Sequence, residues 1–285
     1  MESVLPEIIN RFTSSDGTQR YLLRLRDGES VESVLIPRQD RVTFCISSQV
    51  GCGLGCTFCL TGQLGLSRDL SSEEIIAQVR LLQNETRQRF SVVLMGMGEP
   101  LDNYDNVLGA IRYMHDDRGL KIPMTRITVS TAGLVPAIER LAREPLFPNL
   151  SISLTGVTNK TRDVLMPINR KYPIEMVIEA LRRLPAARQK RVMFECVMIK
   201  GLTDSVEDAQ ILSSLLRGLR VKVNLIPLNP AGEIPFERSQ DDAILRFQDV
   251  LVRNGTATFI RKNRGNDVSS ACGQLKNKIL AGSLL

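Results

Sequence analysis

The feature that most constrains the fold of this chain is a regular alternation of short β-branched runs and helical segments, which starts near residue 40. The expected strands are 42–47, 91–95, 126–130, 150–154, 191–199, 222–226 and 256–260. Segments with an apolar period near 3.6 residues lie between them, at about 71–82, 103–114, 135–142, 173–184, 205–216 and 239–252. Such alternation predicts right-handed βαβ units and a parallel sheet.

The number of repeats indicates an incomplete barrel. Six strand–helix units and a seventh strand are too few for a complete eight-fold barrel, so we expect an α/β fold with an open, partial parallel β/α barrel. A doubly wound sheet would give the same pattern, and periodicity alone does not separate the two. The clearest helix begins at Ser71, which forms a capping-box pair with Glu74.

The first forty residues differ from the rest of the chain. An Asp27–Gly28 turn joins two alternating segments within RYLLRLRDGESVESVLIP, and this pattern is typical of a β-hairpin. We therefore divide the chain into a small N-terminal β-hairpin extension, residues 1–40, and one barrel body, residues 41–285.

Composition and charge exclude several function classes. A single histidine, His115, disfavours Ser-His-Asp triads and His-based metal sites. The net charge of +6 permits a polyanionic partner without requiring one. The first residues lack the basic and apolar regions of a secretory signal, and the longest uncharged stretch is too rich in Gly, Ser and Gln for a membrane span. Clustered cysteines without such a signal indicate a cytoplasmic protein.

The cysteine cluster CGLGCTFC places Cys52, Cys56 and Cys59 in C-x3-C-x2-C spacing. Thiolates are soft ligands for zinc or iron–sulfur centres. Three thiolates on a four-iron cluster leave one iron open to bind another molecule. A structural zinc site usually has four ligands, so the alternative is a zinc site with Cys45 as the fourth.

The position of this motif, after the first strand of a βα repeat, resembles the radical S-adenosylmethionine superfamily. Other segments narrow the resemblance to the RlmN/Cfr family of radical RNA methyltransferases. They are CISSQVGCGLGCTFCLTG, VLMGMGEPLDN, ITVSTAG, LMPINRKYPIE, VNLIPLNP and RGNDVSSACGQL. The resemblance runs from about Ser14 to Gln274. It implies a radical-SAM-type partial barrel, a 4Fe–4S cluster held by three cysteines with one open iron, and two molecules of S-adenosylmethionine per turnover.

The family's cofactor contacts match residues at the ends of successive expected strands, where parallel α/β barrels place their active groups. The implied contacts are Gly98, Glu99, Ser130, Ser153, Leu154, Thr155 and Asn224. Several of them also have an ordinary interpretation: Gly98–Pro100 as a turn, Ser130 as a helix cap and Asn224 as a satisfied polar group. Most relatives have a histidine where this chain has Thr155, which puts that contact in question.

Three further residues match the family's catalytic positions. The resemblance implies that Cys272 accepts a methyl group. The carbon of this methyl group then bonds to an adenine ring carbon, with C2 favoured over C8. Cys45 then attacks the sulfur of Cys272, releasing the product and forming a disulfide. Glu32 matches the base that removes the ring proton. Without the resemblance, Cys45 would be interpreted as a buried small hydrophobe, Cys272 as incidental and Glu32 as a solvated hairpin residue.

The remaining cysteine, Cys196, has no counterpart in the family's chemistry, and we expect it in the core. The resemblance also implies RNA as the partner, ribosomal or transfer RNA, and an electron donor such as flavodoxin or ferredoxin. We expect a monomer that does not contact membranes.

Basic residues near Cys272, namely Arg261, Lys262 and Arg264, are expected to contact phosphates. A second group is attributed to a solvated face; it comprises Arg182, Arg183, Arg188, Lys190 and Arg191. The aromatic content of 5% argues against a broad base-stacking surface.

The typical relative carries an N-terminal accessory domain ahead of the hairpin, and the printed sequence begins almost at the hairpin. We therefore expect either recognition by the barrel alone or a different RNA.

Two alternatives to an RNA methyltransferase stay open on the sequence. One is a radical enzyme that acts on another substrate. The other is a zinc-bound RNA-binding protein without catalytic activity.

Overall fold

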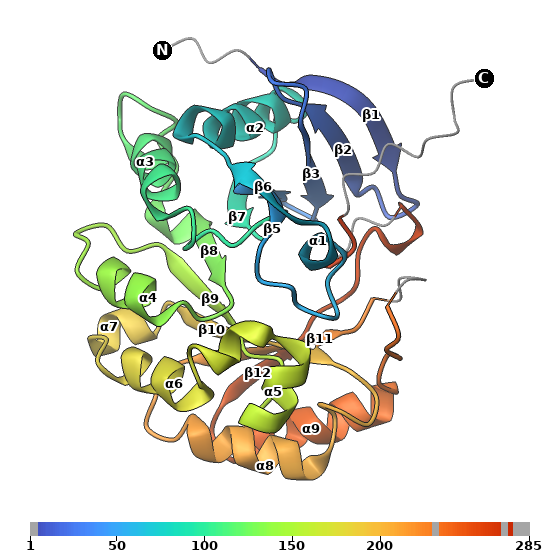
Figure 1. Cartoon of the computed structure of the whole chain (residues 1–285), viewed down its shortest axis with the longest axis vertical. Helices are drawn as coiled ribbons and strands as arrows, with labels where there is room; N and C mark the ends of the chain where they lie inside the picture. The colour runs from blue at the N-terminus through green and yellow to red at the C-terminus, as the bar shows by residue number, and fades with distance from the viewer. Residues whose placement is uncertain (1–4, 230–233, 269–272, 276–285) are drawn as a thin grey trace.

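The computed structural model describes residues 5–229, 234–268 and 273–275. Within these residues the main element is a curved ten-stranded sheet, with helices along its outer side (Figure 1). In spatial order its strands are β1 (Glu7–Thr13), β2 (Gln19–Arg24), β3 (Ser30–Pro37), β4 (Val42–Cys45), β7 (Phe90–Leu94), β8 (Ile127–Thr131), β9 (Asn149–Ser153), β10 (Val192–Met198), β11 (Lys222–Pro227) and β12 (Ala257–Ile260). A separate hairpin is formed by β5 (Gln49–Cys52) and β6 (Gly65–Asp69).

Helices lie between successive strands along the chain from β5 onward. They are α1 (Leu60–Gln63), α2 (Ser72–Asn84), α3 (Tyr104–His115), α4 (Val135–Leu141), α5 (Asn159–Leu165), α6 (Ile174–Arg182), α7 (Ala186–Gln189), α8 (Val206–Leu215) and α9 (Asp241–Arg253). The Ser71–Glu74 capping box is confirmed: the Ser71 side chain accepts from the Glu74 N–H at 3.2 Å, and the Glu74 carboxylate accepts from the Ser71 N–H at 2.8 Å.

Strand pairing confirms the open, partial barrel. Among the residues that the structure describes, seven strands pair in parallel, each with its neighbour in the sheet: β4, β7, β8, β9, β10, β11 and β12. In the described part of the chain, β1 and β12 are the two edges and do not pair with each other, so the sheet does not close. A doubly wound order, which reverses direction at the first strand, is not observed.

The N-terminal hairpin is confirmed, and it is larger than the sequence indicated. Strands β2 and β3 pair antiparallel around the Asp27–Gly28 turn, and β1 adds a further antiparallel strand. Strand β3 then pairs antiparallel with β4, so the extension continues the main sheet.

The two faces of the parallel strands have different chemistry. Side chains that point outward, such as Phe44, Val92 and Ile152, are fully buried beneath the helices. The opposite face carries polar side chains and Cys45, because successive residues of a strand alternate between faces. No helix in the described part of the chain is long and apolar enough to cross a membrane.

Candidate functional site

The cysteine motif forms a loop within the small β5–β6 hairpin, which the sequence did not reveal. Gly51 has a φ of +78°, and a Cβ there would lie 1.9 Å from the carbonyl oxygen of Gly65, so the hairpin requires glycine. The loop is anchored to distant segments by main-chain hydrogen bonds. Thr57 N–H donates to Leu165 O at 3.0 Å, and Leu60 N–H donates to Gly273 O at 2.8 Å.

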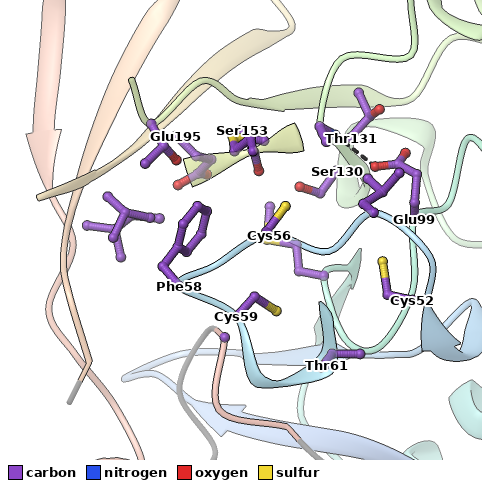
Figure 2. A pocket seen from close by; sticks show the side chains of 18 of the residues that line it. Cys52, Cys56, Phe58, Cys59, Thr61, Glu99, Ser130, Thr131, Ser153 and Glu195 are labelled. Carbon is purple, nitrogen blue, oxygen red and sulfur yellow. Dashed lines mark hydrogen bonds between the residues drawn. The ribbon is translucent and has the colours of Figure 1, made fainter. Parts of the chain in front are cut away.

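The three thiols of this loop line one cavity (Figure 2). Among the described residues, no three His, Cys, Asp or Glu side chains converge closely enough to hold one metal ion. Separated thiols that face one cavity fit a four-iron cluster, in which each cysteine binds a different iron. Cys45, the fourth ligand of the zinc alternative, lines a different cavity. The donor set therefore favours the cluster over zinc.

Burial affects the protonation of the loop. It raises the pKa of the Cys52 thiol to about 12 and that of Cys56 further still. Both thiols are therefore protonated at neutral pH unless a cation replaces the proton. Since thiolates are the metal-binding form, loading the loop releases protons.

The GEP segment after β7 lies against the start of the cysteine hairpin. Gly98 has a φ of +101°, and a Cβ there would lie 2.6 Å from Cβ of Gln49, so only glycine fits. The next residue, Glu99, is 3% exposed and donates its N–H to the Gln49 side-chain oxygen at 2.8 Å. These contacts fix Gly98 and Glu99 on the wall of the thiol cavity.

The Glu99 carboxylate joins the ends of two strands. It accepts hydrogen bonds from Leu101 N–H at 3.0 Å, from Ala132 N–H at 2.8 Å and from the Thr131 hydroxyl (Figure 2). Burial raises its pKa to about 7, although these hydrogen bonds oppose the shift. A carboxylate has about four acceptor positions, so one remains available to a ligand in the cavity.

The serines at the ends of β8 and β9, Ser130 and Ser153, also line the thiol cavity, facing the cysteine loop (Figure 2). Ser130 is not a helix cap, because α4 begins after Leu134. The side chain of Leu154 is fully buried in the core, and its N–H donates to Glu195 O at 2.9 Å. Any contribution of Leu154 to a cofactor is therefore through its backbone.

Thr155 lines the same cavity in an unusual backbone conformation. Its φ is +55°, a left-handed value that is rare for a β-branched residue. The side chain is 1% exposed, and within the described chain its hydroxyl has no hydrogen-bond partner. A buried hydroxyl beside a cavity is a ready contact for a ligand.

Two charged residues of the site were missed in the sequence analysis. Glu195, on β10, is 4% exposed and accepts from Ser151 Oγ at 2.9 Å and from Asn224 Nδ2 at 2.8 Å. Asn224 is thus a satisfied polar group whose orientation Glu195 fixes. The signal was present in RVMFECVMI: strand alternation places Glu195 on the face opposite Phe194 and Cys196. Cys196 is 1% exposed and lies in the core, as expected.

Arg162, on α5, is the second missed residue. It is fully buried and donates through Nη2 to Ala132 O at 2.5 Å and, more weakly, to Ser153 O at 3.5 Å. Within the described chain its Nε and Nη1 atoms have no hydrogen-bond partner. Burial lowers its pKa to about 10, and the nearby Cys56 opposes the shift. The guanidinium is therefore a charged group behind the cysteine loop at neutral pH.

A second cavity adjoins the first inside the partial barrel. Cys45 lines it and is 7% exposed, and Asn224 lines it from β11. Glu195 lines both cavities and lies on the wall between them. The thiol loop and Cys45 therefore face adjoining spaces.

Glu32 is close to Cys45 in the sheet but does not line either cavity. The pairing of Val34 with Cys45 places Glu32, two residues earlier in β3, on the same face. Glu32 is 2% exposed, and its Oε1 lies 2.7 Å from Nη1 of Arg20, so it is not a solvated hairpin residue. Cys272 lies outside the described residues. Gly273, which follows it in the sequence, lines the thiol cavity.

The profile of the Radical SAM superfamily matches residues 46–210, which is more than half of the chain. The Geobacter sulfurreducens protein named dual-specificity RNA methyltransferase RlmN is 48% identical over 266 residues, covering 93% of this chain and 73% of the relative. The protein of the same name from Syntrophobacter fumaroxidans is 46% identical over 271 residues, covering 94% of this chain and 79% of the relative.

A solved structure shows the same architecture. The crystal structure of a radical SAM methyltransferase from Sphaerobacter thermophilus superposes with a TM-score of 0.92 at 43% identity. The match covers 96% of this chain and 82% of the other. The likeness includes both the N-terminal strands and the partial barrel, since it extends over nearly the whole chain.

Proposed function

Because the chain belongs to the radical SAM superfamily and, within it, to the RlmN family, we propose that it methylates a ring carbon of adenosine in RNA. The observation that carries the proposal is the convergence of the thiols of Cys52, Cys56 and Cys59 with Glu99 and Ser153 on one cavity, beside a second cavity lined by Cys45. C2 of adenine is the favoured position over C8, and ribosomal or transfer RNA is the substrate.

The thiol cavity holds the cofactors in this proposal. The three cysteines would hold a 4Fe–4S cluster, and S-adenosylmethionine would bind in the same cavity. The other contacts to S-adenosylmethionine come from Gly98, Glu99, Ser130, Ser153, Leu154, Thr155 and Asn224. When bound, the cluster would supply an electron, and S-adenosylmethionine would supply the methyl group and a radical that abstracts hydrogen. Two molecules of S-adenosylmethionine are consumed per turnover.

Two thiols and a carboxylate carry the rest of the reaction. Cys272 would carry the methyl group as a thioether. Loss of a hydrogen atom from this methyl group to the cofactor-derived radical would let the methyl carbon bond to the adenine ring, and the cluster would accept the electron left on the adduct. Glu32, which is buried and paired with Arg20, takes the ring proton. The Cys45 thiolate attacks the sulfur of Cys272 and forms a disulfide. The sulfur–carbon bond breaks, the released carbon takes up a proton, and the methylated base leaves.

The reaction requires an electron donor and a reducing compartment. An electron donor such as flavodoxin or ferredoxin reduces the cluster, and the disulfide must be reduced before the next turnover. A reducing cytoplasm supplies both conditions. We propose that the chain acts there as a monomer.

The direct test is incubation of the anaerobically reconstituted protein with cellular RNA and methyl-labelled S-adenosylmethionine, followed by mass spectrometry of the nucleosides. Labelled 2-methyladenosine is the expected product, and 8-methyladenosine would move the site to C8. If a protein with an intact cluster cleaves S-adenosylmethionine without labelling RNA, the substrate belongs to another class.

Metal analysis separates the proposal from the zinc alternative. The expected content is about four irons per chain, with none retained after Cys56→Ala. Cys196→Ala, a buried cysteine outside the loop, is the matched control and should keep its iron. A colourless protein that holds zinc would contradict the radical mechanism.

A further inference from the structure

Phe259 is an exposed aromatic side chain on the inner side of the partial barrel. It is 53% exposed and lines the same cavity as Cys45. Its strand, β12, is an edge of the described sheet. Several other exposed apolar residues, such as Met176 on α6 and Leu245 on α9, lie on helices, where single exposed apolar side chains are ordinary.

Strand register relates Phe259 to the candidate site. Phe259 pairs with Asn224, Asn224 pairs with Glu195, and Glu195 pairs with Ser153. Paired residues of neighbouring strands share a face, so these side chains form one row across the inner side of the sheet. A planar group stacked on Phe259 would therefore lie at the end of a row that leads to the thiol cavity.

Arginines from the two ends of the chain converge on this cavity. Arg38 comes from the turn between β3 and β4, and Arg261 and Arg264 follow β12; all three line the cavity. Burial lowers the pKa of Arg38, and the neighbouring charges of Arg41, Arg261 and Arg264 lower it further. Like charges held this close favour the binding of a polyanion, which relieves their repulsion.

Carboxylates of the described residues also face this cluster. Asp16 lies 4.0 Å from Arg264, and Glu195 interacts with Arg261 from the inner face. The cavity is about 520 Å³, within the range of sites that enclose a small organic group. It thus combines a cationic rim, an exposed aromatic ring and a route to Cys45.

From these features we infer that the open side of the barrel is an entry site for single-stranded RNA, in which Phe259 stacks against a base and Arg38, Arg261 and Arg264 contact the phosphates. This inference rests on the proposed function and assigns the path of its substrate. An acidic peptide would satisfy the arginines but offers no planar ring to Phe259. RNA satisfies both, since stacking on aromatic residues and phosphate contacts are how single strands are bound.

The test uses the full chain and a single-stranded oligoribonucleotide that carries 2-aminopurine in place of one adenosine. Binding to the wild type should change the fluorescence of 2-aminopurine by quenching it. Phe259→Ala should weaken binding about tenfold, as expected for the loss of one base stack, and should abolish this quenching on binding. Phe259→Tyr should retain both properties. Leu245→Ala, at an equally exposed position on α9, is the matched control and should bind like the wild type.

The arginines are tested by the salt dependence of binding. Each of Arg38→Gln and Arg264→Gln should lower the slope of log affinity against log salt by about one, because one phosphate contact is lost. Arg246→Gln removes the same charge from the outer helix α9, where the arginine pairs with Asp242, and should leave the slope unchanged.

The outcomes distinguish this inference from the proposed function. If the wild type methylates RNA and Phe259→Ala neither weakens binding nor reduces quenching, the entry site is wrong and the function stands. If polyglutamate binds as tightly as the oligoribonucleotide, the partner of this surface is an acidic protein. If the wild type neither binds nor methylates RNA, the proposed function fails and the entry site fails with it.

Discussion

Glu99 and Arg162 hold the backbone of the same residue from opposite sides. The Glu99 carboxylate accepts from Ala132 N–H at 2.8 Å, and the Arg162 guanidinium donates to Ala132 O at 2.5 Å. Ala132 follows β8, directly after the two residues Ser130 and Thr131 that line the thiol cavity. Two buried charged groups thus fix the strand end that faces the cysteine loop.

The first prediction concerns the pH dependence of stability through Glu99. Its pKa is about 7 in the folded protein, above its ordinary value of 4.5, so its stabilising contribution is present below pH 4.5 and is lost as the pH rises to 7. Relative to Glu99→Gln, the wild type should lose roughly 3 kcal/mol of unfolding free energy over this range, at 1.36 kcal/mol per pKa unit. Urea denaturation at pH 4.5 and pH 7.5 measures the difference.

Glu99→Gln also lowers the unfolding free energy by an amount that does not depend on pH, because an amide cannot accept all three hydrogen bonds that Glu99 accepts. For this reason the informative quantity is how the difference in unfolding free energy between the wild type and Glu99→Gln changes with pH. A wild type that gains stability relative to the variant as the pH rises would show that the hydrogen bonds outweigh desolvation at this carboxyl group.

The second prediction concerns the charge of Arg162. Arg162→Met deprives Ala132 O of its donor but also removes a buried, incompletely hydrogen-bonded charge, so the two effects on stability should largely cancel. The loss of a positive charge near Cys56 should make reduction of the cluster at least tenfold less favourable, about 59 mV for one electron. A redox titration followed by electron paramagnetic resonance measures this, and Arg162→Lys should restore much of the potential. An unchanged potential would limit Arg162 to a structural role.

The third prediction concerns the buried hydroxyl of Thr155. Thr155→Val keeps the shape of the side chain and removes a hydroxyl that has no partner within the described chain. Its unfolding free energy should stay within about 1 kcal/mol of the wild type. Its affinity for S-adenosylmethionine should fall about tenfold if the hydroxyl contacts the cofactor, and equilibrium dialysis measures this. Equal affinities would show that Thr155 contributes only its backbone.

The fourth prediction separates the roles of Cys45 and Cys272. Cys45→Ala should accumulate RNA covalently attached to the protein, because in the proposed mechanism the Cys45 thiol releases the product. Cys272→Ala should attach none, since the methyl carrier is missing. Denaturing electrophoresis with labelled RNA detects the adduct. Methylation of RNA by Cys272→Ala would refute the mechanism that uses both thiols.

Local patterns in the sequence were enough to predict much of this protein. The order of strands and helices followed from apolar periodicity, because that period depends on neighbours a few residues apart. The cysteine loop and the residues at the strand ends followed from short motifs. Missed elements were short or lacked a clear period: β1, the β5–β6 hairpin, α1, α5 and α7.

The tertiary structure decided which residues far apart in the sequence meet. Nothing near Arg162 indicates that this arginine on a short helix is fully buried and reaches Ala132. Likewise, Arg38 and Arg261 share one cavity although more than two hundred residues separate them. The sequence by itself determined most of the secondary structure and the spacing of the clustered cysteines, because both are encoded locally. The burial of charges and the composition of the cavities depend on how the sheet curves, and therefore only the folded chain determines them.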